Sequence, residues 1–400
     1  MRRPRREVRP DGPLRVLFVV PHMAVGGAER HAATLLTGFD RERFAGSLLC
    51  LQHQGGPGTN LEAVRAAGLP TVELARSKRD VAGMVLDLVR HLRRERPDVV
   101  ILRGFNAETL GRVAGVLARV PRLAVWVHNC GDVQPHSAAR RAVDKVLARV
   151  TDAVYGVAHA QKTYITTELG HDVDKVRIVH NGTDLGWTTP EPSGRDTDLA
   201  HALGIADDEL VIGTAAVMRP EKDQATLLRA FRHVADARAD VRLVLAGDGR
   251  ERPRLEALTD ELGLRERVLF LGHRDDVPHL LRVFDVFTLS SKTVECFPMS
   301  VLEAMSAGVP AVCTDVGGVA EMVDDGVTGR VVPREDPEAL GAAFLEVLAD
   351  PARARAMGLA GRRRVREEFT LQRSIERAQA VIEETAGRPV RETDALAAGR

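Results

Sequence analysis

Short apolar runs alternate with longer amphipathic stretches along most of the chain. The apolar runs are rich in Val, Leu and Ile, which is typical of strands buried on both faces of a parallel sheet. They cover residues 14–20, 47–51, 98–102, 123–127, 152–157, 209–217, 241–247, 268–272, 285–290 and 309–313. Helical periodicity fills the segments between them, for example 26–39, 81–95 and 224–237. This alternation predicts a doubly wound α/β fold.

The alternation is interrupted at residues 183–202, which are rich in Pro, Gly, Ser, Thr and Asp. Such a composition is typical of a linker, so we expect two α/β domains. After Val332 only helical patterns follow. The expected organisation is a disordered basic tail (1–13), an N-terminal domain (14–182), the linker (183–202), a C-terminal domain (203–370), a last helix (371–386) that packs back on the N-terminal domain, and a loose tail (387–400).

The composition narrows the class of protein. Hydrophobic residues make up 44% of the chain and charged residues 28%, as in globular proteins. Lys and Arg together number 56, as do Asp and Glu, and aromatic residues are only 4%. A nucleic-acid-binding protein needs an excess of basic charge and aromatic stacking platforms. We therefore expect no nucleic-acid partner.

We expect a cytoplasmic location. No apolar run approaches the roughly 18 residues of a membrane span, and the run after the basic tail is too short for a signal-peptide core. The cysteines, Cys50, Cys130, Cys296 and Cys313, lie far apart and form no CxxC pair. Neither a disulfide framework nor a zinc site is implied, which fits a reducing compartment.

The most informative candidate residues lie between residues 294 and 318. Glu295 and Glu303 are separated by seven positions, and a Phe-Pro pair precedes an apolar helix. We expect Ser300 to cap this helix and Glu303 to lie in its first turn. The amides of residues 297–301 and the helix dipole can bind a diphosphate, and Glu303 can accept hydrogen bonds from a ribose. The alternative is a capping box that binds no ligand.

This stretch resembles the family 4 glycosyltransferases of the GT-B fold, which are retaining enzymes with nucleotide-sugar donors. The family motif E-G-F-x-x-x-x-x-E-A-M-A-x-G-x-P-V-V stands here as E-C-F-P-M-S-V-L-E-A-M-S-A-G-V-P-A-V. The resemblance implies that Glu295 contacts the transferred sugar and that Glu303 binds the ribose. Cys296 replaces the usual glycine, which puts the shape of the sugar pocket in doubt. The resemblance also implies two facing Rossmann-like domains with a cleft between them and C-terminal helices crossing back.

The N-terminal half resembles the same family. Residues 21–30 resemble its glycine-rich loop, where Gly26 and Gly27 let the backbone approach a ligand. His128 ends an apolar run at the position where the family often has a histidine near the acceptor and the anomeric carbon. Ala158 stands where the family usually has a serine, which puts that contact in doubt.

Residues 217–231 resemble the segment of the family that neutralises the donor diphosphate. The resemblance places Lys222 at the diphosphate. Val217 occupies the position of the usual arginine, and Arg219 is the candidate to replace its charge.

Residues 271–287 match the segment whose backbone meets the nucleotide base, near His273 and Arg274. Because that contact is largely made by the main chain, the sequence does not identify the base. The implied catalytic residues are Glu295, His128, Lys222 and Arg219; the implied donor-binding residues are Gly26, Gly27, Arg219, Lys222, His273, Arg274, Glu295, Phe297, Pro298, Met299, Ser300, Val301 and Glu303.

Cofactor sites fit the sequence less well. GDGRER at 247–252 has only two of the three glycines of a dinucleotide-binding motif. Asp196-Thr197-Asp198 spells D-x-D, but it lies in the predicted linker. Since GT-B enzymes use helix dipoles and basic side chains in place of a cation, we expect no catalytic metal and no cofactor besides the donor.

Arg141, Lys145 and Arg149 are spaced to form a basic stripe on one predicted helix. Such a stripe can contact anionic lipid at the inner membrane face; an ordinary solvated face is the alternative.

We interpret the chain as a retaining enzyme that transfers a hexosyl group from a nucleotide diphosphate sugar to a hydroxyl acceptor, which is a glycan, a lipid-linked sugar or a small molecule. The alternatives are a catalytically silent sugar-nucleotide-binding protein, as Val217, Cys296 and Ala158 suggest, and a sugar-nucleotide epimerase of the same fold. The donor base, the sugar and the acceptor stay open.

Overall fold

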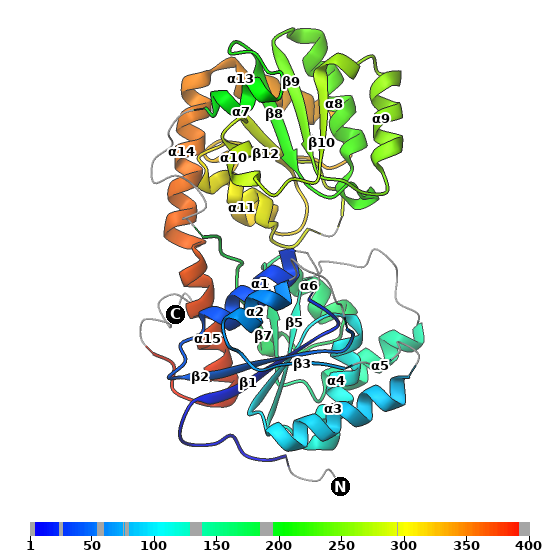
Figure 1. Ribbon diagram of the computed structural model, residues 1–400, viewed down its shortest axis with the longest axis vertical. Helices are drawn as coiled ribbons and strands as arrows, with labels where there is room; N and C mark the ends of the chain where they lie inside the picture. Colours follow the sequence, from blue (N-terminus) through cyan, green and yellow to red (C-terminus); the bar gives the residue numbers. More distant parts are fainter. Residues whose placement is uncertain are drawn as a thin grey trace. The chain divides into compact units, whose positions relative to one another are not determined.

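The computed structural model describes residues 5–23, 27–53, 60–74, 76, 80–128, 138–184, 195–293 and 295–391. The chain divides into two compact units (Figure 1). The first comprises Met1–Asn129, Gln134–Asn181 and Gln372–Arg400, and the second comprises Cys130–Val133 and Gly182–Leu371.

A parallel sheet with the strand order β3-β2-β1-β4-β5-β6-β7 forms the centre of the first unit. Its strands are β1 (Leu14–Val20), β2 (Phe44–Cys50), β3 (Thr71–Glu73), β4 (Val99–Leu102), β5 (Arg122–Val127), β6 (Ala153–Gly156) and β7 (Val176–Ile178). Its helices are α1 (Gly27–Gly38), α2 (Asn60–Ala66), α3 (Val81–Glu95), α4 (Phe105–Ala118), α5 (Ala138–Ala148), α6 (Gln161–Thr163) and α15 (Leu371–Ala386), of which Leu371 belongs to the second unit.

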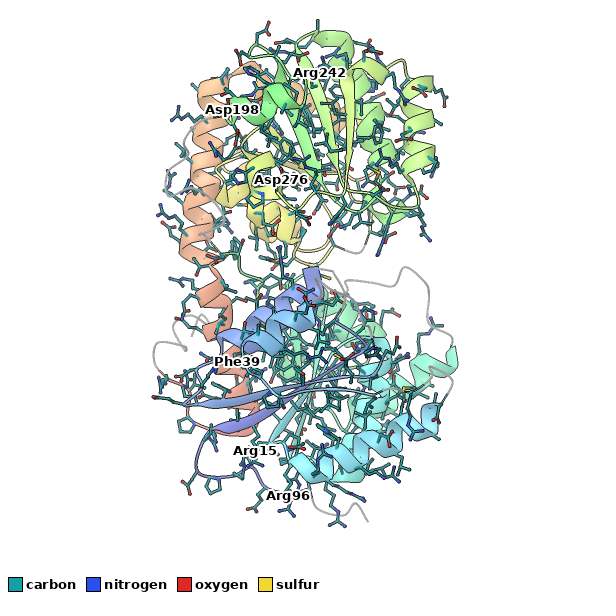
Figure 2. All side chains as sticks on the ribbon, viewed as in Figure 1. Arg15, Phe39, Arg96, Asp198, Arg242 and Asp276 are labelled. Atoms are coloured by element: carbon teal, nitrogen blue, oxygen red, sulfur yellow. The ribbon has the colours of Figure 1, made fainter. Side chains whose placement is uncertain are left out.

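Both faces of this sheet are covered by helices, as the apolar runs predict. Leu17 and Val19 of β1 pack in one apolar cluster with residues of α3 and α4, such as Leu88. The intervening Phe18 points to the opposite face, where its ring lies 6.2 Å from that of Phe39 (Figure 2). A strand buried on both sides has no polar face, which explains why it reads as a continuous apolar run.

The second unit has a parallel sheet with the order β10-β9-β8-β11-β12-β13. Its strands are β8 (Leu210–Ala215), β9 (Val241–Ala246), β10 (Val268–Gly272), β11 (Val286–Leu289), β12 (Ala311–Thr314) and β13 (Gly329–Val332). Its helices are α7 (Thr197–Ala202), α8 (Gln224–Ala237), α9 (Arg252–Glu261), α10 (Val277–Leu281), α11 (Met299–Ser306), α12 (Val319–Met322), α13 (Pro337–Ala349) and α14 (Pro351–Glu368). The sequence therefore predicted the α/β class correctly.

Helix α15 is the last described helix of the chain, and it packs on the first unit. The Tyr155 hydroxyl lies 2.7 Å from the Thr385 hydroxyl. Arg43 and Glu383 form an ion pair with Nη2 and Oε2 2.7 Å apart. Both side chains of this pair are only 10% exposed, so the contact is largely shielded from water. The first unit is thus completed by residues from the opposite end of the chain.

The predicted linker at 183–202 is partly wrong. Its last residues form α7, and the Asp196 side chain caps this helix by accepting a hydrogen bond from the Leu199 amide at 3.2 Å. Asp198 lies on α7 itself (Figure 2). The D-x-D sequence is therefore a helix start, because aspartate favours the N-cap as well as loops. Residues 185–194 lie outside the described residues, as do residues 1–4 and 392–400. The expectation of a disordered basic tail is wrong for its described part, because Arg9 pairs with Asp98 at 2.7 Å.

In the described part of the chain, every helix is too short or too polar to cross a lipid bilayer.

Candidate functional site

Loops that follow strands of the second sheet carry most of the predicted donor-binding residues. In a parallel sheet these loops meet at one edge. Lys222 ends a short 3-10 turn after β8, and Ser291 follows β11. Gly247 follows β9 with a φ of +134°, and a Cβ at this position would lie 2.1 Å from the Ala216 carbonyl oxygen. Only glycine lets these two loops pack so closely.

The centre of this edge is an ion pair between Lys222 and Glu295. The Glu295 side chain is 8% exposed and the Lys222 side chain 26%. The Ser291 hydroxyl donates to the same Glu295 oxygen, Oε1, at 2.6 Å. Among the described residues no hydrogen bond to Oε2 is recorded, so this oxygen can accept a hydrogen bond from a ligand hydroxyl.

Helix α11 begins at Met299, one residue before the predicted cap. Pro298 is the N-cap residue, and its carbonyl accepts from the Val301 amide at 3.2 Å. Ser300 is therefore not the cap, and Glu303 lies beyond the first turn. The expected cap is wrong because the helix begins one residue earlier, with Pro298, whose side chain accepts no hydrogen bond, at the N-cap. The Met299 and Ser300 amides precede the first intrahelical bond, so a ligand can use them.

Several side chains around α11 belong to the protein core. Val301 is fully buried, and the Phe297 ring lies 5.2 Å from the Phe369 ring. Cys296 and Glu303 are also buried, at 5% and 7% exposure. The side chains of Phe297 and Val301 therefore hold the loop in place, and the Val301 amide is already donated to the Pro298 carbonyl.

Arg219 lies apart from the Lys222–Glu295 pair. Its side chain is 60% exposed, and its nearest recorded carboxylate is Glu221 at 4.0 Å. It lines a cavity of about 290 Å³ together with Lys292 and Arg254. The Lys222 amide donates to the Arg219 carbonyl at 3.0 Å, but among the described residues the Arg219 side chain is not recorded in contact with Lys222 or Glu295. A role for Arg219 at the diphosphate stays a prediction.

His273 and Arg274 follow β10 at the same edge of the sheet. His273 is exposed and lies 3.2 Å from Asp275. Arg274 makes two bonds to Asp276, which precedes α10 (Figure 2). These bonds raise the pKa of the Arg274 guanidinium. The pairing keeps the loop ordered and leaves its backbone to meet a base.

In the first unit, His128 directly follows β5. Its ring centre lies 5.5 Å from that of His31 and 6.2 Å from that of Trp126. Burial, with the nearby Arg103 charge, holds the pKa of His128 well below its usual value. His128 is therefore neutral at pH 7, and its buried Nε2 has no recorded hydrogen-bond partner. Gly26 lies outside the described residues, and Gly27 is the exposed first residue of α1.

Sequence reasoning missed two residues at these edges. Ser291 was overlooked because a serine after a strand is common. Arg103 follows β4 and is 7% exposed. An arginine directly after a continuous apolar strand was the signal that could have found it, because such a position lies at the ligand-binding edge of a parallel sheet.

Family models match both halves of the chain. The model described as Glycosyltransferase Family 4 matches residues 25–187, and the model described as Glycosyl transferases group 1 matches residues 196–364. Together they leave only the ends and a short segment near the linker uncovered.

Curated relatives are glycosyltransferases with different substrates in their names. A UDP-Gal:alpha-D-GlcNAc-diphosphoundecaprenol alpha-1,3-galactosyltransferase of Escherichia coli is 27% identical over 77% of this chain and 81% of its own length. An N-acetyl-alpha-D-glucosaminyl L-malate synthase of Bacillus anthracis is 31% identical over 46% of this chain and 48% of its own length.

A solved structure with the same fold is that of Anabaena Alr3699/HepE in complex with UDP-glucose. It has a TM-score of 0.80 and 22% identity, and the match covers 94% of this chain and 100% of that chain. At this identity the likeness shows the fold, which is GT-B. From the two family models and this fold, the chain belongs to the family 4 glycosyltransferases, enzymes that take a sugar from a nucleotide-sugar donor.

Proposed function

We propose that this chain is a retaining hexosyltransferase that moves one sugar from a nucleotide diphosphate sugar to a hydroxyl acceptor. The observation that carries the proposal is the Lys222–Glu295 ion pair. Helix α11 begins four residues after Glu295, and no described side chain caps its first amides. A cation, a buried carboxylate and unpaired amides are the groups that a diphosphate and its sugar require.

In the proposed reaction the bond from the anomeric carbon to the diphosphate oxygen breaks, and a bond to the acceptor oxygen forms. Positive charge develops on the sugar ring while negative charge develops on the diphosphate. Lys222 and the amides of Met299 and Ser300 stabilise the leaving group. Arg219 adds a further charge, and Glu295 orients the sugar through its free Oε2. The acceptor proton passes to the leaving phosphate, which accounts for retention without a carboxylate nucleophile.

His128 is proposed to contact the reacting sugar. Because its imidazole is neutral, it can accept a hydrogen bond from a hydroxyl. The ribose is assigned to Glu303, and the base to the backbone at His273 and Arg274. No metal is part of this proposal, since basic side chains and amides supply the charge that a cation would.

The test is a thermal-shift screen of the full-length protein with GDP-mannose, UDP-glucose and UDP-N-acetylglucosamine. A ligand at 100 times its Kd stabilises a protein by about 2.7 kcal/mol. The stabilising donor is then supplied in labelled form with candidate acceptors. Transfer of the label supports the proposal. Binding without transfer supports the silent binding protein, and conversion of the free nucleotide sugar supports the epimerase.

A second proposal concerns the membrane. Helix α5 exposes Arg141 and Lys145, and Arg149 follows it. The same helix exposes Val143 at 46% and Val146 at 57%. Basic and apolar side chains together suit a peripheral contact with anionic lipid. Sedimentation with phosphatidylglycerol vesicles tests this, and equal sedimentation with neutral phosphatidylcholine vesicles would contradict it.

A further inference from the structure

Arg103 is a buried arginine at the carboxyl edge of the first sheet. It directly follows β4, and its backbone amide donates to the Val19 carbonyl at 3.0 Å. The residue is only 7% exposed. Arg103 lies close enough to His31 and His128 for its positive charge to contribute to the lowered pKa of both imidazoles.

Among the described residues, the Arg103 guanidinium is not recorded with a carboxylate partner. Within the described part of the chain, no ion pair and no side-chain hydrogen bond of this residue is recorded, and its Nη2 is buried without an acceptor. Glu29 and Glu108 are the acidic groups whose charges act on it from a distance. Burial nevertheless lowers the pKa of Arg103 to about 10.

Two other arginines with little exposed side chain are paired with a carboxylate. Arg112 is 2% exposed, and its Nη2 lies 2.8 Å from the Asp144 carboxylate. Arg43 is paired with Glu383. Because an unpaired buried charge is strongly unfavourable, proteins normally provide a partner as they do at these two positions. Because the described residues supply no such partner at Arg103, its guanidinium is a candidate to bind an anion from outside the chain.

The surroundings of Arg103 suit an anion. His22 and His128 follow β1 and β5, the two strands that flank β4 in the sheet. His22 Nδ1 and His128 Nε2 are buried, and neither has a hydrogen-bond partner among the residues that the structure describes. Helix α4 begins at Phe105, so its positive end also faces this edge. A guanidinium, two imidazoles and a helix start are the groups that bind phosphate or carboxylate.

We propose that the acceptor substrate carries an anionic group, a phosphate or a carboxylate, which Arg103 binds. The inference rests on the proposed transferase function and names the chemical class of its acceptor. Arg103 would select acceptors by charge. A neutral glycan would leave the buried guanidinium unpaired and would therefore bind poorly.

The first experiment needs neither the donor nor the acceptor. Inorganic phosphate is titrated calorimetrically into a Lys222→Ala background, which weakens phosphate binding at the donor edge. Adding Arg103→Gln should raise the phosphate Kd at least tenfold, and Arg103→Lys should restore part of the binding. The far-ultraviolet circular dichroism and melting temperature of each variant check folding. Equal phosphate binding by Lys222→Ala with and without Arg103→Gln would overturn the proposal.

The second experiment uses matched acceptors with the donor identified by the thermal-shift screen. Glycerol 3-phosphate is compared with glycerol, malate with 1,2,4-butanetriol, and a short polyprenyl phosphate sugar with the free sugar. We expect kcat/KM to favour an anionic member, and Arg103→Gln to lower that kcat/KM by about 100-fold. The preferred pair identifies a soluble phosphate, a carboxylate or a lipid phosphate.

The two proposals fail in different ways. If the wild-type protein transfers sugar to neutral and anionic members equally well, the role of Arg103 is wrong and the transferase function stands. If no donor gives transfer to any acceptor while phosphate binding still depends on Arg103, the anion site stands and the transferase function fails.

Discussion

The Lys222 ammonium and the Glu295 carboxylate neutralise each other in the structure without ligand. In the proposed reaction a donor that enters this edge shares the pair, because its diphosphate attracts Lys222 and its sugar hydroxyls reach Glu295. We expect the bond between the two side chains to weaken as negative charge develops on the leaving diphosphate, when Lys222 would stabilise the transition state most.

Lys222→Ala should lower kcat about 100- to 1000-fold, because one preorganised charge is lost when the diphosphate leaves. Binding of the nucleoside diphosphate should weaken less than kcat falls. Steady-state kinetics and calorimetry measure the two effects. Lys292→Ala is the matched control, since Lys292 lies at the same edge and pairs only loosely with Glu335 at 3.8 Å. Similar kcat values for both variants would exclude Lys222 from the reaction.

Glu303→Ala should weaken nucleoside diphosphate binding about 10- to 100-fold, since charge-assisted hydrogen bonds to the ribose are lost. Glu295→Ala should leave that binding nearly intact and lower turnover instead. Calorimetry with the bare nucleotide separates the two. Glu338→Ala on the exposed first turn of α13 is the control. If the Glu303→Ala variant binds the nucleoside diphosphate as tightly as the wild-type protein, Glu303 does not bind the ribose.

Arg219→Ala tests whether this exposed side chain replaces the arginine that is missing at position 217. If Arg219 swings to the diphosphate, its loss should lower kcat by at least tenfold. Arg254→Ala is the matched control, since Arg254 lines the same cavity. A fully active Arg219→Ala variant would mean that Lys222 and the α11 amides act without a second side-chain charge.

Transfer should survive excess EDTA, because Lys222 and the α11 amides are proposed to supply the positive charge. The assay compares initial rates before and after exhaustive chelation. If the transfer rate is lost after chelation and is restored by added manganese or magnesium, the proposed mechanism is wrong and the reaction depends on a metal.

The pH dependence of stability should report on His31. Burial, and secondarily the Arg103 charge, lower the pKa of His31 to about 3, whereas an unfolded histidine titrates near 6.5. Below pH 6.5 the unfolded chain binds a proton that the folded chain does not, so the free energy of unfolding falls by up to about 1.4 kcal/mol per pH unit. The free energy of unfolding is measured by urea unfolding between pH 7 and pH 4.5. His31→Asn should make it fall less steeply with decreasing pH, by the contribution of the one proton that unfolded His31 takes up. Parallel curves for wild type and variant would contradict the assignment.

The sequence predicted the long strands and helices closely. Helices α3 and α8 begin and end at the predicted residues, because their apolar periodicity is complete. The strands β3 and β7 were missed, since each has three residues and too few positions to show a pattern. Their existence depends on pairing with β2 and β6, which are non-local contacts.

Site residues within motifs were easier to predict than those that depend on spatial neighbours. The spacing of Glu295 and Glu303 is visible in the sequence, and Lys222 follows from the resemblance. The contact between Lys222 and Glu295 joins residues 73 positions apart, and no local pattern encodes it. The missing partner of Arg103 is likewise a property of the folded chain alone.

Helix α15 has a consequence for biosynthesis. The first unit takes its early strands from residues that leave the ribosome first, but its Gln372–Arg400 portion is made only after the whole of Gly182–Leu371. At roughly 5–20 residues per second, that interval is on the order of 10–40 s. During this time the surface that later receives Glu383 and Thr385 is uncovered, so the second unit, although encoded later, can complete its fold first. A stop codon in place of Gln372 would therefore leave the second unit whole and would damage the first unit, which lies mostly in the N-terminal half of the chain.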